Sequence, residues 1–387
     1  MTKRVAVFTG TRADYGLLYW LLVDLKASAS LELQLIVSGM HLSPEFGETW
    51  RLIEQDGFAI DAKVEMLLSS DSRVGVAKAV GLGVLGFSDA LDRLKPDVLV
   101  ILGDRFEAMA IAQTAMIMGV PIAHLHGGEI TEGAYDDSIR HVITKMAKLH
   151  FVATDIYRKR VIQLGEPPEN VQTVGALGLD HFRRTPIMSL DELGESIGFP
   201  LRGPFLLVTY HPVTAEGENP EEGMFELLSV LDECPEYQVI ITYPNADNGG
   251  RALILLIESY AKKNPDRVVT IPSLGFRRYL AAMTYASAVV GNSSSGIIEA
   301  PSLKVPTLDI GTRQKGRLAA SSVVHCGATY AAIKAGLHEV LSTEMAARCQ
   351  KVSNPYGDGH SSEAIVKALE GFDGNQFKAF YDVEFDI

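Results

Sequence analysis

Histidines and carboxylates gather in one short stretch of the sequence, residues 124–141. The stretch contains three histidines and four carboxylates, and two glycines follow its second histidine. Such groups exchange protons, and their mutual interaction separates their pKa values so that some act as acids and others as bases. His124 and His126 are two residues apart, so they share a face if both lie on an extended strand. We therefore expect acid–base chemistry from this stretch.

Two other interpretations of the same residues exist. His-x-His with a nearby Asp can bind zinc or manganese, but the sequence has no HExxH motif and no further spaced histidine to complete a ligand set. We expect no metal. Asp136 or Asp137 could also simply cap the helix that follows. A structural role for the whole cluster is disfavoured, because so many titratable groups at one strand end need a reason.

Two further loops in the first half follow apolar strands. Residues 9–16 open a helix, where free backbone N–H groups can bind phosphate, although Arg12 could equally form only a salt bridge in a tight turn. Asp104 comes directly after Gly103 at the end of the apolar run 98–102. Its simplest role is to cap the next helix. A functional role for these two loops is indicated only by the other candidate residues nearby.

The second half offers groups suited to anions. His211 ends a strand, where it could also be a core histidine, and Pro212 forces a turn. Residues 291–295 form a turn of small residues that leads into a helix, which suits a diphosphate unless the serines only cap the helix. Glu299 lies about one and a half turns further, within reach of a ribose diol. The loop 309–317 carries three cations, among them Arg313, for anion binding or for contact with solvent.

Alternating strands and helices must position these loops. Apolar runs predict strands at 4–9, 31–38, 97–102, 121–125, 150–154, 205–210, 238–242, 268–271 and 288–290. Helices are predicted at 14–27, 72–95, 106–118, 137–149, 189–197 and 361–370, and a Pro- and Gly-containing break covers 185–204. This alternation is typical of two doubly wound Rossmann-type α/β domains, whose ligands bind at the carboxyl ends of the strands. We expect domains at 1–185 and 186–365, and a helix and tail at 366–387 that return to the first domain.

The composition limits the partners. The chain has 387 residues and a net charge of −13, which disfavours nucleic acid and anionic membranes as partners. The apolar run near the N-terminus, residues 5–10, is too short for the core of a signal peptide. The longer apolar stretch 108–125 is interrupted by polar residues and Pro121, so it does not fit a membrane-spanning helix. Three widely spaced cysteines without a CxxC motif indicate a reducing compartment. We therefore expect a cytoplasmic protein.

Seven motifs together resemble the UDP-N-acetylglucosamine 2-epimerases, most of all the hydrolysing, NeuC-type bacterial branch. They lie at residues 10–12, 103–105, 126–129, 136–141, 211–212, 291–294 and 311–314, and the resemblance runs from about residue 4 to 370. It implies a GT-B-like fold with a central cleft. It also implies conversion of UDP-N-acetylglucosamine and water to N-acetylmannosamine and UDP, by elimination of UDP and hydration with inversion at C2, in sialic acid biosynthesis. No cofactor is implied, and family members tend to form homodimers or homotetramers.

The resemblance also implies roles for individual residues. Asp104, Glu129 and Asp136 are similar to the acid–base carboxylates, and His126 and His211 are further catalytic candidates. The substrate-binding candidates are Arg12, Arg105, Asn245, Gly291, Asn292, Ser293, Ser294, Glu299 and Arg313. Many family members carry Glu at the position of His126, so either His126 or Glu129 handles the proton.

Four alternative functions remain open at this point. The chain could be a non-hydrolysing epimerase, or an epimerase of a UDP- or GDP-linked diacetamido-trideoxy sugar on the route to legionaminic acid. It could also be a glycosyltransferase with the same fold, or an inactive nucleotide-sugar sensor. The carboxylates at 104, 129 and 136 argue against the sensor.

Overall fold

The computed structural model describes residues 2–68, 72–130, 135–212, 220–244 and 250–384. The chain divides into two compact units. The first consists of Met1–His181 together with Tyr356–Ile387, and the second of Phe182–Pro355. The second unit is therefore an insertion in the chain of the first.

The first unit is built on a parallel sheet, which has seven strands in the described part of the chain, in the order β3-β2-β1-β4-β5-β6-β7. The strands are β1 (Lys3–Thr9), β2 (Leu31–Ser38), β3 (Ala62–Val64), β4 (Val98–Leu102), β5 (Ile122–Leu125), β6 (Leu149–Val152) and β7 (Val171–Thr173). The helices are α1 (Arg12–Ala27), α2 (Trp50–Gln55), α3 (Arg73–Leu94), α4 (Phe106–Met118), α5 (Tyr135–Met146), α6 (Asp155–Gln163) and α15 (Ser361–Gly371), with α7 (Asp180–Arg184) at the boundary of the units.

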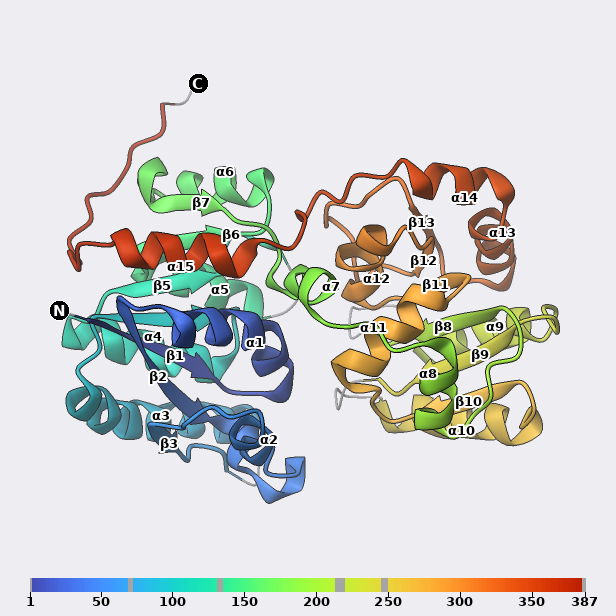
Figure 1. The fold of residues 1–387 in the computed structure, drawn as a ribbon, viewed down its shortest axis with the longest axis horizontal. Coiled ribbons are helices and arrows are strands. Elements are labelled where there is room, and N and C mark those ends of the chain that lie inside the picture. The colour runs from blue at the N-terminus through green and yellow to red at the C-terminus, as the bar shows by residue number, and fades with distance from the viewer. Residues whose placement is uncertain (1, 69–71, 131–134, 213–219, 245–249, 385–387) are drawn as a thin grey trace. The chain divides into compact units, whose positions relative to one another are not determined.

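Helices cover both faces of this sheet, because the strand side chains alternate between two cores. On β1, Val5 and Val7 face the core that contains α1 and α15, whereas Ala6 and Phe8 face the core of α3, α4 and α5. Figure 1 shows α1 and α15 side by side. Burial on both faces explains why the strands read as continuous apolar runs.

The C-terminal residues complete the first unit. The expected boundary at 365/366 falls inside α15, whereas the structure places the boundary at 355/356. The reason is that Ile365 and Leu369 of α15 are fully buried in the core with α1. Further along, the Lys378 ammonium donates to the buried carboxylate of Glu166 at 2.6 Å.

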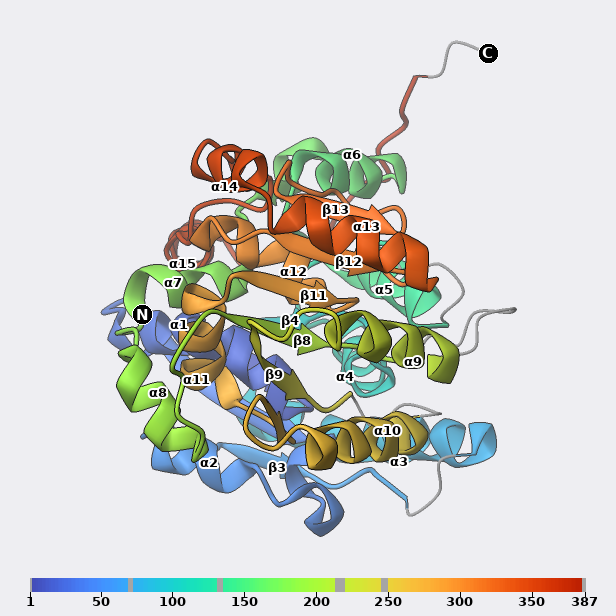
Figure 2. The ribbon, with the colours of Figure 1, turned by 90° about the vertical axis from the view of Figure 1, so that its right-hand side faces the viewer.

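The second unit repeats the architecture with a parallel sheet, which has six strands among its described residues, in the order β10-β9-β8-β11-β12-β13 (Figure 2). The strands are β8 (Phe205–Thr209), β9 (Gln238–Thr242), β10 (Val268–Ile271), β11 (Ala288–Gly291), β12 (Thr307–Ile310) and β13 (Val323–Cys326). The helices are α8 (Leu190–Ile197), α9 (Pro220–Leu231), α10 (Gly250–Lys263), α11 (Gly275–Tyr285), α12 (Ser294–Ile298), α13 (Tyr330–Val340) and α14 (Thr343–Gln350).

The helices of the second unit also lie on two faces. Residues of α9, α10 and α13 share one core with the sheet, and residues of α8 and α11 share the other. Each unit is thus a doubly wound parallel α/β structure, which confirms the predicted fold class. In both sheets the candidate loops follow the carboxyl ends of strands, where such folds bind ligands.

Candidate active site

The loop after β4 presents Asp104. Gly103 has a φ of +77°, which turns the chain sharply away from the strand. Asp104 does not cap the next helix, the simpler role that we considered for it, because the residue at the N-cap of α4 is Arg105. The Asp104 carboxylate instead forms an ion pair with the Arg140 guanidinium.

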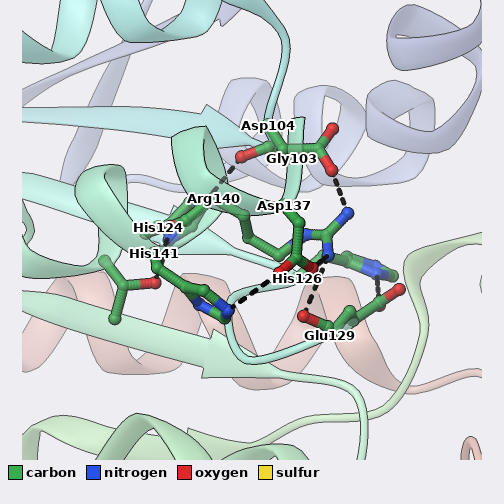
Figure 3. A network of polar contacts seen from close by, with 9 residues as sticks. Gly103, Asp104, His124, His126, Glu129, Asp137, Arg140 and His141 are labelled. Atoms are coloured by element: carbon green, nitrogen blue, oxygen red, sulfur yellow. Dashed lines mark hydrogen bonds and ion pairs between the residues drawn. The ribbon is translucent and has the colours of Figure 1, made fainter. Parts of the chain in front are cut away.

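Arg140 lies at the centre of a polar network in the first unit (Figure 3). Its side chain is 6% exposed and projects from α5. Besides Asp104, its guanidinium donates to the Asp137 carboxylate at 3.2 Å and to the Glu129 carbonyl oxygen at 2.9 Å. One arginine therefore fixes the loop after β4, the loop after β5 and the first turn of α5 to each other. The sequence motif contains Arg140, but we assigned it no role.

His126 does not share a face with His124, contrary to our expectation. β5 ends at Leu125, and His126 follows with a φ of +62°, in the left-handed region that non-glycine residues seldom adopt. The strand alternation therefore stops one residue too early. The Nδ1 atom of His126 lies 2.7 Å from Oε1 of Glu129. Its Nε2 atom is buried and has no hydrogen-bond partner among the described residues.

This contact links His126 and Glu129, the two residues that the sequence left as alternative proton-handling groups. A carboxylate only accepts hydrogen bonds, so an ionised Glu129 selects the His126 tautomer that carries its proton on Nδ1. The lone pair then resides on Nε2. Backbone strain of this kind persists where the surrounding structure enforces it, and it is common at active sites.

His124 contacts the loop that carries Asp104. It is fully buried on β5, and its Nε2 atom lies 2.8 Å from the Gly103 carbonyl oxygen while its Nδ1 atom lies 3.1 Å from the Thr144 hydroxyl. Burial lowers the pKa of His124 to about 3. It is thus a neutral side chain that orients the loop carrying Asp104.

Asp136 and Asp137 lie in the first turn of α5, which begins at Tyr135, so neither is the N-cap. Burial, and then the charge of Asp104, raise the pKa of Asp136. The charges of Arg105 and Arg140 oppose this effect. The structure thus brings Asp104 and Asp136 close enough to interact, and the raised pKa favours the protonated form of Asp136, which can deliver a proton.

Arg105 is oriented by a residue that we did not select. The carboxylate of Glu107 is completely buried and accepts from Arg105 Nε at 3.2 Å and Nη2 at 3.3 Å. The signal in the sequence is that Glu107 is the single charged residue of the apolar helix α4. Burial also raises the pKa of the nearby Asp14 to about 6. Arg12 is the exposed first residue of α1, a helix capped by the Thr11 side chain.

In the second unit, Asn292 contacts two other candidate residues, His211 and Arg313, and also Gln314. Its side chain accepts from the His211 backbone N–H at 2.6 Å and donates to the His211 carbonyl oxygen at 2.9 Å. Its own carbonyl oxygen accepts from Arg313 Nη1 at 3.1 Å and from the Gln314 amide at 2.8 Å. Asn292 therefore holds the loops after β8, β11 and β12 together.

His211 is neutral in this setting. Burial, helped by the neighbouring Arg313 charge, lowers the pKa of His211 to about 3. It can therefore donate one hydrogen bond to an anion but brings no charge, and Arg313 is the cation of this group. Gly291 is required beside it: its φ is +132°, and an added Cβ atom would lie 2.0 Å from the Thr209 carbonyl oxygen.

The small-residue turn provides hydroxyl groups. Ser293 is the N-cap of α12, but its hydroxyl makes no capping bond and lies 3.0 Å from the Ser295 hydroxyl. Ser294 is the first residue of this helix, which has only five residues. We expected Glu299 to lie about one and a half turns into a longer helix, but it is the C-cap of this short one. Burial raises the pKa of Glu299 to about 7. Asn245 lies outside the described residues.

A metal centre finds no support in the described part of the chain, where no three His, Cys, Asp or Glu side chains are grouped as metal ligands. The absence of a cofactor remains an expectation from the family resemblance.

Comparison with known proteins identifies the family of the chain that carries these loops. The family model described as UDP-N-acetylglucosamine 2-epimerase matches residues 23–370. The chain belongs to this family. A relative from Campylobacter jejuni, GDP/UDP-N,N'-diacetylbacillosamine 2-epimerase (hydrolyzing), is 40% identical over 325 residues, 84% of each chain. A Legionella pneumophila relative, UDP-N,N'-diacetylbacillosamine 2-epimerase (hydrolyzing), is 36% identical over 372 residues, 96% of each chain.

Solved structures of the family share the fold. The crystal structure of UDP-GlcNAc 2-epimerase from Neisseria meningitidis bound to UDP-GlcNAc has a TM-score of 0.82 at 18% identity, over 96% of this chain and all of that one. The predicted GT-B-like fold and the resemblance to the hydrolysing branch are confirmed. The chain is thus a hydrolysing nucleotide-sugar 2-epimerase.

Proposed function

We propose that this 2-epimerase hydrolyses a UDP- or GDP-linked 2,4-diacetamido-2,4,6-trideoxyglucose (N,N'-diacetylbacillosamine) and releases the free sugar with inverted C2. The observation that carries this substrate is the 40% identity to the Campylobacter jejuni relative that is named for it. The Legionella pneumophila relative supports the same sugar. This substrate was our alternative at the sequence level, and it has the better support.

The reaction has two steps that balance. A base takes the proton from C2 while the bond between C1 and the diphosphate oxygen breaks, and the bond electrons leave with the nucleoside diphosphate. A C1=C2 double bond remains in the sugar. Water then adds its hydroxyl group to C1, and C2 receives a proton on the opposite face. One water molecule is consumed, and the products are the nucleoside diphosphate and the 2-epimer.

The proton-handling residues lie in the first unit. His126, with its lone pair on Nε2 and its Nδ1 atom bonded to Glu129, is suited to remove a proton. Asp136, with its raised pKa, is suited to deliver one. Asp104, ion-paired to Arg140, contributes a fixed negative charge that supports the proton on Asp136. Two different groups are thus available to act on C2, and inversion requires that they act on opposite faces.

The diphosphate residues lie in the second unit. Arg313 supplies a cation and the neutral His211 supplies a hydrogen-bond donor, and Asn292 orients both. The hydroxyls of Ser293 and Ser294 are further donors. Together these groups stabilise the charge that develops as the diphosphate departs. Glu299 is suited to accept from a ribose hydroxyl.

The test is a comparison of three nucleotide sugars with the purified full chain. UDP-N-acetylglucosamine and the UDP- and GDP-linked diacetamido sugars are each incubated with the enzyme, and release of nucleoside diphosphate is measured with product identification by NMR. We expect the highest kcat/KM for a diacetamido sugar, with the manno epimer as product. A higher kcat/KM for UDP-N-acetylglucosamine contradicts the substrate assignment.

The second candidate substrate is UDP-N-acetylglucosamine, converted to N-acetylmannosamine. It is favoured by the description of the family model that covers residues 23–370. The same assay distinguishes a further possibility, because an intact epimeric nucleotide sugar without free nucleoside diphosphate is the product of a non-hydrolysing enzyme.

The proposal extends to the cellular location and the oligomeric state of the enzyme. The three cysteines are free thiols, as is usual for proteins of a reducing compartment, and support a cytoplasmic location. We also infer that the chain acts as a homo-oligomer, a homodimer or homotetramer.

A further inference from the structure

Glu107 is a completely buried carboxylate in the first turn of α4. Two loops of the first unit enclose it. A Cβ atom added to Gly39, after β2, would lie 3.2 Å from Oε1 of Glu107, and one added to Gly10, after β1, would lie 3.6 Å from its Cβ atom. Its ion-pair partner, Arg105, belongs to the loop after β4. The carboxylate therefore lies where three strand-end loops meet.

Stability alone does not account for this pair. Burial of a charge is costly, and replacement of a buried ion pair by apolar side chains of similar volume is often neutral or stabilising. The two partners also differ in exposure, because the side chain of Arg105 is 43% exposed and that of Glu107 is 0% exposed. The pair thus consists of an enclosed carboxylate and an arginine that reaches the surface, where it can meet a ligand.

The contact with Glu107 determines which donors of Arg105 stay available. Nε donates to Oε2 at 3.2 Å and Nη2 donates to Oε1 at 3.3 Å, so one edge of the planar guanidinium is occupied. The third nitrogen, Nη1, lies at the corner away from Oε2, and it makes no hydrogen bond with any described residue. A guanidinium donates hydrogen bonds and accepts none. Glu107 thereby presents Nη1 to a ligand atom that accepts.

The charges around Arg105 favour a neutral acceptor over an anion. Glu107 balances the charge of the guanidinium, and Asp14 and Asp136 also lie close enough to interact with it electrostatically. These carboxylates repel a diphosphate, for which Arg313 of the second unit is the proposed cation. Sugar hydroxyls can donate to carboxylates, whereas the carbonyl oxygen of an amide only accepts. An amide carbonyl is therefore the group of the substrate that suits Nη1 best.

We propose that Glu107 is a positioning residue, which directs Nη1 of Arg105 at the carbonyl oxygen of the acetamido group on C2 of the substrate. This contact selects 2-acetamido sugars over 2-hydroxy sugars. The amide nitrogen is bonded to C2, the carbon on which Asp136 acts, and Arg105 is a neighbour of Asp136. The inference rests on the proposed function, because the diacetamido sugar and UDP-N-acetylglucosamine share this acetamido group.

The experiment compares ligands that differ only at C2. UDP and the analogues of UDP-N-acetylglucosamine and UDP-glucose in which a CH2 group replaces the glycosidic oxygen are titrated into the full chain by calorimetry. The CH2 link keeps the diphosphate on C1, so binding is measured without turnover. The readout is the acetamido preference, which is the dissociation constant of the 2-hydroxy ligand divided by that of the 2-acetamido ligand. A second pair with the 4-acetamido-6-deoxy pattern should behave alike, because the contact at C2 is common to both.

Two variants test the two residues. The double variant R105M/E107Q removes the guanidinium without leaving a charge buried. We expect its acetamido preference to fall at least about 10-fold, as for the loss of a hydrogen bond from a charged donor, with UDP affinity unchanged. Glu107→Gln alone keeps Arg105 but turns an amide N–H, which cannot accept, against the guanidinium. We expect E107Q to lose the preference to a similar extent.

The control pair is Arg4 and Asp97. These residues also form an ion pair, and the side chain of Arg4 is 39% exposed, close to the value for Arg105. They lie at the amino ends of β1 and β4, whereas the candidate site follows the carboxyl ends. The double variant R4M/D97N should keep the wild-type acetamido preference, whatever its effect on the thermal midpoint.

Four results would overturn the proposal. They are an unchanged preference in R105M/E107Q, a preference that E107Q retains, an equal loss of affinity for all three ligands including UDP, and an equal loss of preference in R4M/D97N. The third result would assign Arg105 to the nucleotide instead of the sugar. Failure of the proposed substrate gives a different pattern: the wild type then hydrolyses UDP-N-acetylglucosamine faster than the diacetamido sugars, while the acetamido preference and its loss in the variants remain.

Discussion

Replacement of Arg140 by Met separates the structural and chemical consequences of the polar network. Methionine keeps an unbranched, largely apolar side chain but lacks the guanidinium, so it removes three polar contacts, to the carboxylates of Asp104 and Asp137 and to the Glu129 carbonyl oxygen. Breaking a fully buried ion pair costs about 3–5 kcal/mol. The Asp104 and Asp137 side chains are 22% and 28% exposed, so water takes over part of the role of the arginine. We expect R140M to lower the free energy of unfolding by about 2–3 kcal/mol.

The chemical consequence concerns Asp136. The positive charge of Arg140 is one of the influences that lower the pKa of Asp136 against burial and Asp104. Without it the pKa of Asp136 rises further, because only the charge of Arg105 then opposes burial and the charge of Asp104. The pH–rate profile of nucleoside diphosphate release should therefore shift its Asp136-dependent limb to higher pH, with kcat lowered more than KM is raised.

The matched control is Arg158→Met. Arg158 on α6 is half-buried, whereas Arg140 is buried, and it donates to the backbone carbonyl oxygens of Val171 and Pro168, both at 2.9 Å. R158M should destabilise the chain but leave the pH profile in place. If R140M behaves like R158M, with lower stability and an unchanged profile, Arg140 is only structural and the reasoning about the network is refuted.

Three other predictions follow from single residues. Gly291→Ala should lower the unfolding midpoint strongly, by the equivalent of about 3 kcal/mol or more, because its Cβ atom would overlap the Thr209 carbonyl; an unchanged midpoint in urea would show that the strands relax. Burial lowers the pKa of His41 to about 4, so the unfolded chain takes up a proton below pH 6.5 that the folded chain refuses. Stability should therefore fall as pH drops from 6.5 towards 4, by about 1.4 kcal/mol per pH unit from this group, and His41→Gln should flatten that fall in urea titrations at several pH values. Asn292→Asp replaces the amide that donates to the His211 carbonyl by a carboxylate; calorimetry should show UDP affinity at least about 10-fold weaker, and unchanged affinity would remove these loops from the diphosphate site.

Much of the fold could be predicted from hydrophobic pattern alone. The observed bounds of β2, α4, β9 and β10 are those that we predicted, since these elements are apolar runs of the right length between turn residues. The sequence analysis missed the edge strands β3, β7 and β13, whose exposed positions weaken the apolar pattern. It also missed β12, which is buried but whose four residues include Asp309. Periodicity reports burial, so an element that is hardly buried leaves little trace.

The candidate site was predictable in composition but not in geometry. Asp104 and Asp136 lie close enough to interact because both follow neighbouring strands of one sheet, and the sequence analysis had grouped them only through the family resemblance. The role of Arg140 depends on which face of α5 points to the loop after β4, and local sequence does not contain that information. His126 was misplaced because strand alternation assumes an extended backbone, whereas its left-handed φ is set by the loop and by Glu129.

The insertion of the second unit into the first has a consequence for how the protein is made. The ribosome releases residues 1–181 first, but their sheet still lacks α15, which buries Ile365 and Leu369 against α1. The carboxylate of Glu166 likewise cannot form its ion pair with Lys378 until that later part of the chain has been synthesised. Domains that are contiguous in sequence fold as they emerge. Here the second unit can fold during synthesis, and the unit that begins first is completed last.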